Sequence, residues 1–191
     1  MKIRTPREKR ILYIKNILRW IITYAVIFIC FLIMTSGTWL KPVLLVPAAV
    51  AVALANGQLS SAFTGAVCGY LIDIAGDKVI GTNAVILTVF SVVISLLYEY
   101  YLRNKFVNYM IITAVVSYVV LWLDYKFYYE MWEYEYVERI FAQTSMKVWA
   151  YTIVSAVVIY FIFELINHYL MPKNHVTIEE AVSTAVQTGR H

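Results

Sequence analysis

Charged residues are scarce in this sequence. Asp, Glu, Lys and Arg make up 15% of its 191 residues, hydrophobic residues make up 61%, and the mean hydropathy is +0.68. Soluble domains contain about 45–50% apolar and about 25% charged residues. The composition therefore excludes an ordinary soluble domain. It predicts an all-α polytopic membrane helix bundle whose length suits one domain.

Residues that carry common chemistry are few or unfavourably placed. The two cysteines, Cys30 and Cys68, both lie in apolar runs, so we expect small buried hydrophobes rather than a disulfide or a metal site. His168, His175 and His191 do not have the spacing of a metal-ligand cluster. The sequence contains no glycine-rich nucleotide loop, HExxH or GxSxG. We therefore expect no enzymatic activity, no cofactor and no metal.

Long apolar runs, in contrast, are abundant. A helix of about 20 apolar residues spans the roughly 30 Å hydrocarbon core of a bilayer. Residues 43–72 carry no charge over 30 positions, which is too long for one upright span, and Asn56-Gly57-Gln58 interrupts them. We expect two short helices there, although a re-entrant segment at 43–55 stays open. The six predicted transmembrane helices cover residues 20–39, 43–55, 59–75, 81–101, 106–123 and 148–171.

Basic residues cluster before the first span. Residues 1–19 contain seven Lys or Arg and form a predicted basic amphipathic segment on the cytoplasmic side; specific binding of anionic lipid head groups is the alternative. Six spans and five spans both place eleven Lys or Arg inside, so this count does not choose between them. Helix length and the break at Asn56 favour six spans in residues 20–171, with both termini cytoplasmic.

Two further segments have an unusual composition. Residues 124–139 are acidic and rich in Tyr and Trp, which is typical of an interfacial helix, a partner surface or an aromatic belt at the headgroup level. The cytoplasmic tail, residues 172–191, contains a capping-box pattern at 177–180. The tail is either a docking helix or a segment resting on the membrane.

Small residues share one face of the predicted helix 59–75. Ser61, Gly65, Gly69, Asp73 and Asp77 recur every four residues, so they line one helix face. Small residues at this spacing let a second helix approach closely in lipid. The next helix carries a polar stripe of its own, which predicts a face turned toward other helices or a cavity: Ala84, Thr88, Ser91, Ser95 and Glu99.

A turn is predicted between these two helices, flanked by Gly76 and Gly81. The Asp73 carboxylate is placed to accept hydrogen bonds from backbone N–H groups of the turn or of the next helix. Asn83 lies in the first turn of that helix, where its amide can satisfy unpaired N–H groups. The alternative role for Asp73 is proton or ion transfer together with Glu99 and Glu164.

These residues resemble the core of the MreD family, the rod shape-determining membrane proteins of bacteria. The family pattern is a glycine-rich helix, Leu-x-Asp, a short turn and Leu-Gly-x-Asn. Size, a short second helix and six spans also fit, whereas Ile80, the Tyr-rich loop and the tail depart from the pattern. The matching run is Gly65-x3-Gly69-Tyr-Leu-Ile-Asp73-x2-Gly76-x4-Gly81-Thr-Asn83-Ala.

The resemblance implies a non-catalytic membrane scaffold of the bacterial cell-elongation (rod) complex in the cytoplasmic membrane. Its implied partners are MreC, RodA with a class B penicillin-binding protein and, indirectly, MreB filaments; no nucleic acid is expected. The implied fold is similar to the substrate-binding subunits of energy-coupling-factor transporters, so a vitamin-type solute transport subunit is the alternative function. The bulky first span, without an Ala-x3-Ala pair, favours the scaffold.

Overall fold

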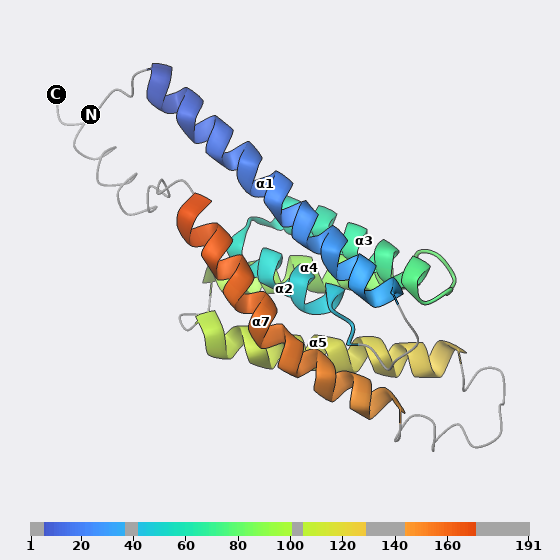
Figure 1. Cartoon of the computed structure of the whole chain (residues 1–191). Helices are drawn as coiled ribbons and strands as arrows, with labels where there is room; N and C mark the ends of the chain where they lie inside the picture. The colour runs from blue at the N-terminus through green and yellow to red at the C-terminus, as the bar shows by residue number, and fades with distance from the viewer. Residues whose placement is uncertain (1–5, 37–41, 101–104, 129–143, 171–191) are drawn as a thin grey trace.

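Helices account for almost all of the residues that the structure describes. The computed structural model describes residues 6–36, 42–100, 105–128 and 144–170, with side chains for 13–36, 42–98, 106–127 and 144–170. No strand occurs in these ranges, which confirms the all-α class. The helices, shown in Figure 1, are α1 (Pro6–Thr35), α2 (Leu45–Ala55), α3 (Gln58–Ala75), α4 (Thr82–Tyr100), α5 (Lys105–Tyr128) and α7 (Met146–Leu170).

The short helix α2 lies at the centre of the bundle and contacts each of the other five helices that the structure describes. Every residue from Leu45 to Ala53 is buried. The helix has apolar side chains on all faces, and such a helix is stable only when it is enclosed. Its many Ala and Val residues let the neighbours approach closely. Pro47 is tolerated because its missing N–H falls in the first helical turn.

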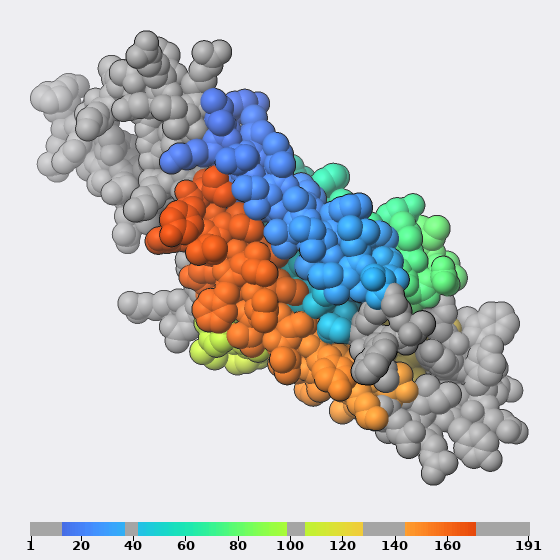
Figure 2. Space-filling view, in the orientation of Figure 1, coloured from blue at the N-terminus to red at the C-terminus, as the bar shows by residue number. Residues whose placement is uncertain are grey.

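The outer faces of the bundle are apolar. Large hydrophobic side chains are exposed along α1 and α7, which lie side by side in Figure 2. An exposed apolar surface of this extent is typical of contact with lipid. Three helices are long and apolar enough to cross a membrane, and they indicate a membrane protein: Tyr13–Thr35, Phe106–Phe127 and Met146–Leu170.

Polar groups connect the helices inside the bundle. The Tyr109 hydroxyl is within 3.2 Å of the Pro47 and Ala156 carbonyl oxygens, so α5 is joined to α2 and α7. The Val43 N–H donates to Thr152 Oγ1 at 3.0 Å, and Trp149 Nε1 donates to the Ala114 carbonyl at 3.0 Å. These two bonds join α7 to α5 and to the segment that precedes α2.

The predicted break at Asn56 is confirmed, because α2 ends at Ala55 and α3 begins at Gln58. Both Asn56 and Gly57 have extended backbones, and Asn56 Nδ2 donates to the Val52 carbonyl at 2.9 Å. Some helix ends differ from the predicted spans. Helix α1 begins within the basic segment and ends at Thr35 rather than at residue 39, and α5 continues five residues past 123. Residues 129–139 and the tail 172–191 lie outside the described residues.

Candidate functional site: the turn between α3 and α4

The small-residue face of α3 lies directly against α4. A Cβ atom on Gly69 would lie 2.5 Å from the Ala84 Cα and from the Asn83 carbonyl carbon. A Cβ atom on Gly65 would lie 2.5 Å from Ser91 Oγ. Backbone atoms cannot move aside as a flexible side chain does, so Gly69 admits no side chain. The close helix contact predicted from the spacing is present.

Helix α3 ends in a Schellman motif at Gly76. The Lys78 N–H donates to the Asp73 carbonyl at 3.0 Å, and the Asp77 N–H donates to the Ile74 carbonyl at 3.4 Å. In this motif one residue adopts a left-handed conformation, and here Asp77 does so with φ 49°. Asp77 lies in the turn, as its position between Gly76 and Gly81 predicts; the helical face therefore ends before it, and its side chain is exposed.

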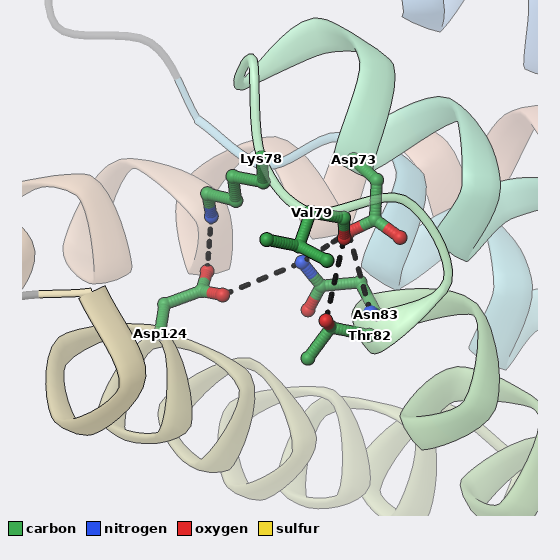
Figure 3. A network of polar contacts seen from close by, with 6 residues as sticks. All are labelled: Asp73, Lys78, Val79, Thr82, Asn83 and Asp124. Carbon is green, nitrogen blue, oxygen red and sulfur yellow. Dashed lines mark hydrogen bonds and ion pairs between the residues drawn. The ribbon is translucent and has the colours of Figure 1, made fainter.

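The Asp73 carboxylate bridges the turn, as Figure 3 shows. Its Oδ2 accepts the Gly81 N–H at 2.8 Å. Its Oδ1 accepts the Asn83 backbone N–H at 3.3 Å and the Asn83 side-chain Nδ2 at 2.9 Å. Asp73 and Asn83 are both fully buried. The carboxylate thus accepts bonds from the turn and from the start of α4, as the sequence predicts.

The direction of the hydrogen bonds predicted for the Asn83 side chain was wrong. Its amide does not accept from orphan N–H groups of α4; instead Nδ2 donates to Asp73 and, at 3.3 Å, to Asp124 Oδ1 on α5. The buried Asn83 Oδ1 has no hydrogen-bond partner. Asn83 therefore links two carboxylates from helices that are distant in the sequence.

Asp124 was not expected at this site, because the sequence analysis placed it in a separate acidic segment after the fifth span. It forms an ion pair with Lys78, whose side chain is 24% exposed while that of Asp124 is 12% exposed. Lys78 comes from the α3–α4 turn and Asp124 from the last turns of α5 (Figure 3). The two residues are 46 positions apart, and no local sequence pattern predicts their pairing.

The two glycines of the turn have different importance. Gly81 has φ +107°, a conformation that favours glycine, and its N–H is one of the bonds to Asp73. Gly76 has φ −103°, and a Cβ atom there would meet only the flexible Lys78 side chain, at 3.0–3.3 Å. Gly81 is therefore required by the backbone, and Gly76 is not.

A cavity of about 740 Å³ lies at the opposite end of the bundle, between α1, α2, α4 and α7. Arg19 lines it and is buried, with Nη2 donating to Asn56 Oδ1 at 2.7 Å. Ser95 Oγ donates to the Asn56 carbonyl at 2.9 Å. Glu164 lines this cavity, so Asp73 and Glu164 belong to different sites. The sequence analysis did not predict the cavity, because it treated Arg19 only as one of seven basic residues in a segment that is either a topology signal or a binding site for anionic lipid head groups.

The described residues were also compared with the requirements of a metal site. Within the described residues, no group of three His, Cys, Asp or Glu side chains could hold a metal ion. Cys30 and Cys68 are buried and unpaired with each other, in agreement with their expected role as small hydrophobes.

The structure thus brings the predicted motif residues to one turn and its adjoining helix contact: Gly65, Gly69, Asp73, Gly76, Gly81 and Asn83. Comparison of the chain with protein-family models, with curated proteins and with solved structures finds no match.

Proposed function

We propose that this chain is a non-catalytic scaffold subunit of the bacterial cell-elongation complex, of the MreD type. In this role it links MreC, the MreB filaments and the RodA and class B penicillin-binding protein synthase that builds peptidoglycan. The observation that carries the proposal is the buried Asp73 carboxylate, which accepts three hydrogen bonds inside the motif run. A carboxylate committed in this way fixes a turn rather than transferring protons.

The turn offers a surface that a partner can recognise. Val79 and Ile80 are 69% and 63% exposed, and they lie between the Schellman motif and the Asp73 bonds. A surface that is already ordered loses little conformational entropy when a partner binds. We assign contact with the membrane partner MreC to this turn.

The proposed topology has six membrane passages in the bacterial cytoplasmic membrane, with both termini in the cytoplasm. Helices α3 and α4 have 18 and 19 residues, about 27 and 28 Å at 1.5 Å per residue. Helix α2 has 11 residues, about 16 Å. It is the one short passage, and its neighbours shield it from lipid. The seven basic residues of segment 1–19 support the cytoplasmic position of the N-terminus.

Affinity purification from native membranes tests the scaffold role. Recovery of MreC and synthase subunits is the expected result. A Val79→Asn, Ile80→Asn variant should lose about tenfold in MreC recovery, because apolar contact area is removed. Leu59→Asn is the matched control, since Leu59 is 88% exposed at the other end of α3. Equal MreC recovery for all three proteins, at equal abundance, contradicts the assignment to this turn.

The second candidate is a small-solute transport subunit, and the 740 Å³ cavity is the observation that favours it. Binding sites for small molecules have volumes of about 300–1,000 Å³. In the proposed topology, however, the cavity lies at the cytoplasmic end, next to Arg19, whereas an uptake subunit must take its solute from outside. Recovery of a pair of ATPases instead of MreC establishes the transport function and excludes the scaffold.

A further inference from the structure

The cavity at the Arg19 end is lined by polar and apolar side chains, and the polar ones are in the majority. Trp20, Leu54 and Phe163 line it together with Arg19, Asn56 and Glu164. Small-molecule sites likewise combine apolar side chains with polar groups that fix the orientation of the ligand. The scaffold role does not require such a cavity, so its purpose needs a separate explanation.

Arg19 is the unusual residue of the cavity, because it is only 8% exposed. Its Nη2 is bonded to Asn56, but its Nη1 is buried and has no hydrogen-bond partner. No carboxylate within the described residues forms an ion pair with it. A buried cation with an unmade hydrogen bond is costly unless an anion satisfies it. Arg19 therefore indicates an anionic ligand.

The guanidinium is held in place before any ligand arrives. Asn56 is held by two bonds of its own. Its side-chain Nδ2 donates to the Val52 carbonyl at 2.9 Å, and its backbone carbonyl accepts from Ser95 Oγ at 2.9 Å. The Arg19 Cζ lies 5.4 Å from the centre of the Trp20 ring, within the range of a cation–π interaction. With Nη2 held by Asn56, Nη1 is the nitrogen left for an anionic oxygen. Guanidinium groups pair well with phosphate oxygens.

Glu164 restricts the kind of anion. It lines the same cavity from α7 and is exposed, so its negative charge disfavours a ligand with several anionic groups. A ligand with one phosphate and one ammonium group complements both Arg19 and Glu164. The basic start of α1 also places this end of the bundle where lipid phosphates are concentrated, which favours phosphate over carboxylate.

We propose that this cavity binds a zwitterionic phosphate ester of the phosphoethanolamine type, with the phosphate on Arg19 and the ammonium toward Glu164. The ligand is either the head group of phosphatidylethanolamine or free phosphoethanolamine. This proposal is independent of the scaffold role and of its partners.

Lipid retention tests the proposal on the full chain. The protein is purified from nanodiscs that contain equal phosphatidylethanolamine and phosphatidylglycerol, and bound lipid is measured by native mass spectrometry. We expect selective retention of phosphatidylethanolamine. Arg19→Gln should lower this retention by about tenfold to a hundredfold, as expected for the loss of a charged hydrogen bond. Glu164→Gln should retain lipid but lose the preference for the ethanolamine head group.

Lys15→Gln is the matched control, because Lys15 lies one turn before Arg19 on α1 and is exposed. It should retain lipid like the unaltered protein. An equal loss in Lys15→Gln and Arg19→Gln would mean general surface attraction and would overturn the proposal, as would full retention in Arg19→Gln.

Two further measurements keep the test decisive. Ala55 lines the cavity, so Ala55→Leu narrows it while leaving Arg19 in place. If Arg19→Gln fails to fold, loss of retention in a stably folded Ala55→Leu protein supports the site, and unchanged retention overturns it. Calorimetry with soluble phosphoethanolamine distinguishes the sources: binding of it identifies the free ester, and retention of lipid without such binding identifies the membrane lipid.

Discussion

The side-chain amide of Asn83 donates to the Asp73 carboxylate at 2.9 Å, and neither residue exposes any surface. The bond joins the last turn of α3 to the first turn of α4. Both groups would be costly to bury alone, so each depends on the other. The turn is therefore stable as a unit, and a substitution at either residue should destabilise the packing of both helices.

The substitutions Asp73→Asn and Asp73→Leu should differ strongly in how far they destabilise the protein. Asparagine keeps an acceptor for Asn83 but loses the bond from Gly81, at a cost of about 1 kcal/mol. Leucine leaves three donors unpaired, at about 1–3 kcal/mol each. Thermal unfolding in detergent measures the stability of both variants, and co-purification of the proposed partner MreC and cell-shape complementation measure the proposed function. An Asp73→Asn protein that assembles fully yet is inactive would revive proton transfer and the transport function.

Gly69→Ala should destabilise the protein by about 1–3 kcal/mol, because the added methyl group meets the α4 backbone. Gly76→Ala is the control, since its methyl group meets only the Lys78 side chain, and it should stay within about 0.5 kcal/mol of the unaltered protein. Chemical unfolding in mixed micelles gives both values. Equal stability of the two variants would rule out a tight contact at Gly69.

Asp77 should tolerate glycine better than any branched residue. Its φ of 49° costs an L-residue roughly 1–2 kcal/mol, so Asp77→Gly should stabilise the protein by up to about 1 kcal/mol. Asp77→Val should destabilise it by a similar or larger amount. The midpoints of thermal unfolding decide the order, and a valine variant as stable as the glycine variant would refute the Schellman geometry.

Lys78 and Asp124 should be energetically coupled. We expect a double-mutant cycle with Lys78→Met and Asp124→Asn to give a coupling of about 0.5–3 kcal/mol. Asparagine at 124 keeps an oxygen for Asn83, so the cycle isolates the ion pair. Because both side chains are partly exposed, the coupling should weaken as salt is added. A coupling free energy of zero would show that the ion pair contributes nothing to the stability of the turn.

Cysteine labelling tests the topology. The native Cys30 and Cys68 are buried, so they give little background. Val79→Cys should react with an impermeant reagent on intact cells, whereas Leu59→Cys, at the other end of α3, should react only after permeabilisation. A reporter fused after His191 should be active only in a cytoplasmic format. Reversed labelling, or reporter activity outside, would contradict six passages with cytoplasmic termini.

Features encoded by short local patterns could be predicted from the sequence. Asn56-Gly57 divides the uncharged run because an amide and a glycine favour a break over a continuous helix. Gly65 and Gly69 predict a close contact because their spacing repeats on one helix face. The bonds from backbone N–H groups to the Asp73 carboxylate were also predicted correctly, since a carboxylate one turn before a break has backbone donors within reach.

Features created by packing could not be predicted. Lys78 pairs with Asp124 only because α5 passes the α3–α4 turn, and nothing within either segment encodes that. Asn83 acts as a donor because two carboxylates converge on it. Arg19 belongs to the cavity because α2 ends beside it at Asn56. In the sequence it is one of seven basic residues before the first span, and only its burial distinguishes it.

The enclosure of α2 has a consequence for how the chain is made. An 11-residue helix reaches only about half of the way across a bilayer core, so it has no strong tendency to stay in lipid alone. Its walls are supplied by helices synthesised before and after it, and α5 and α7 are among them. A nascent chain therefore cannot complete this core until α7 has been inserted. Chains that stop before residue 146 leave α2 uncovered, and they should be the ones that membrane proteases remove.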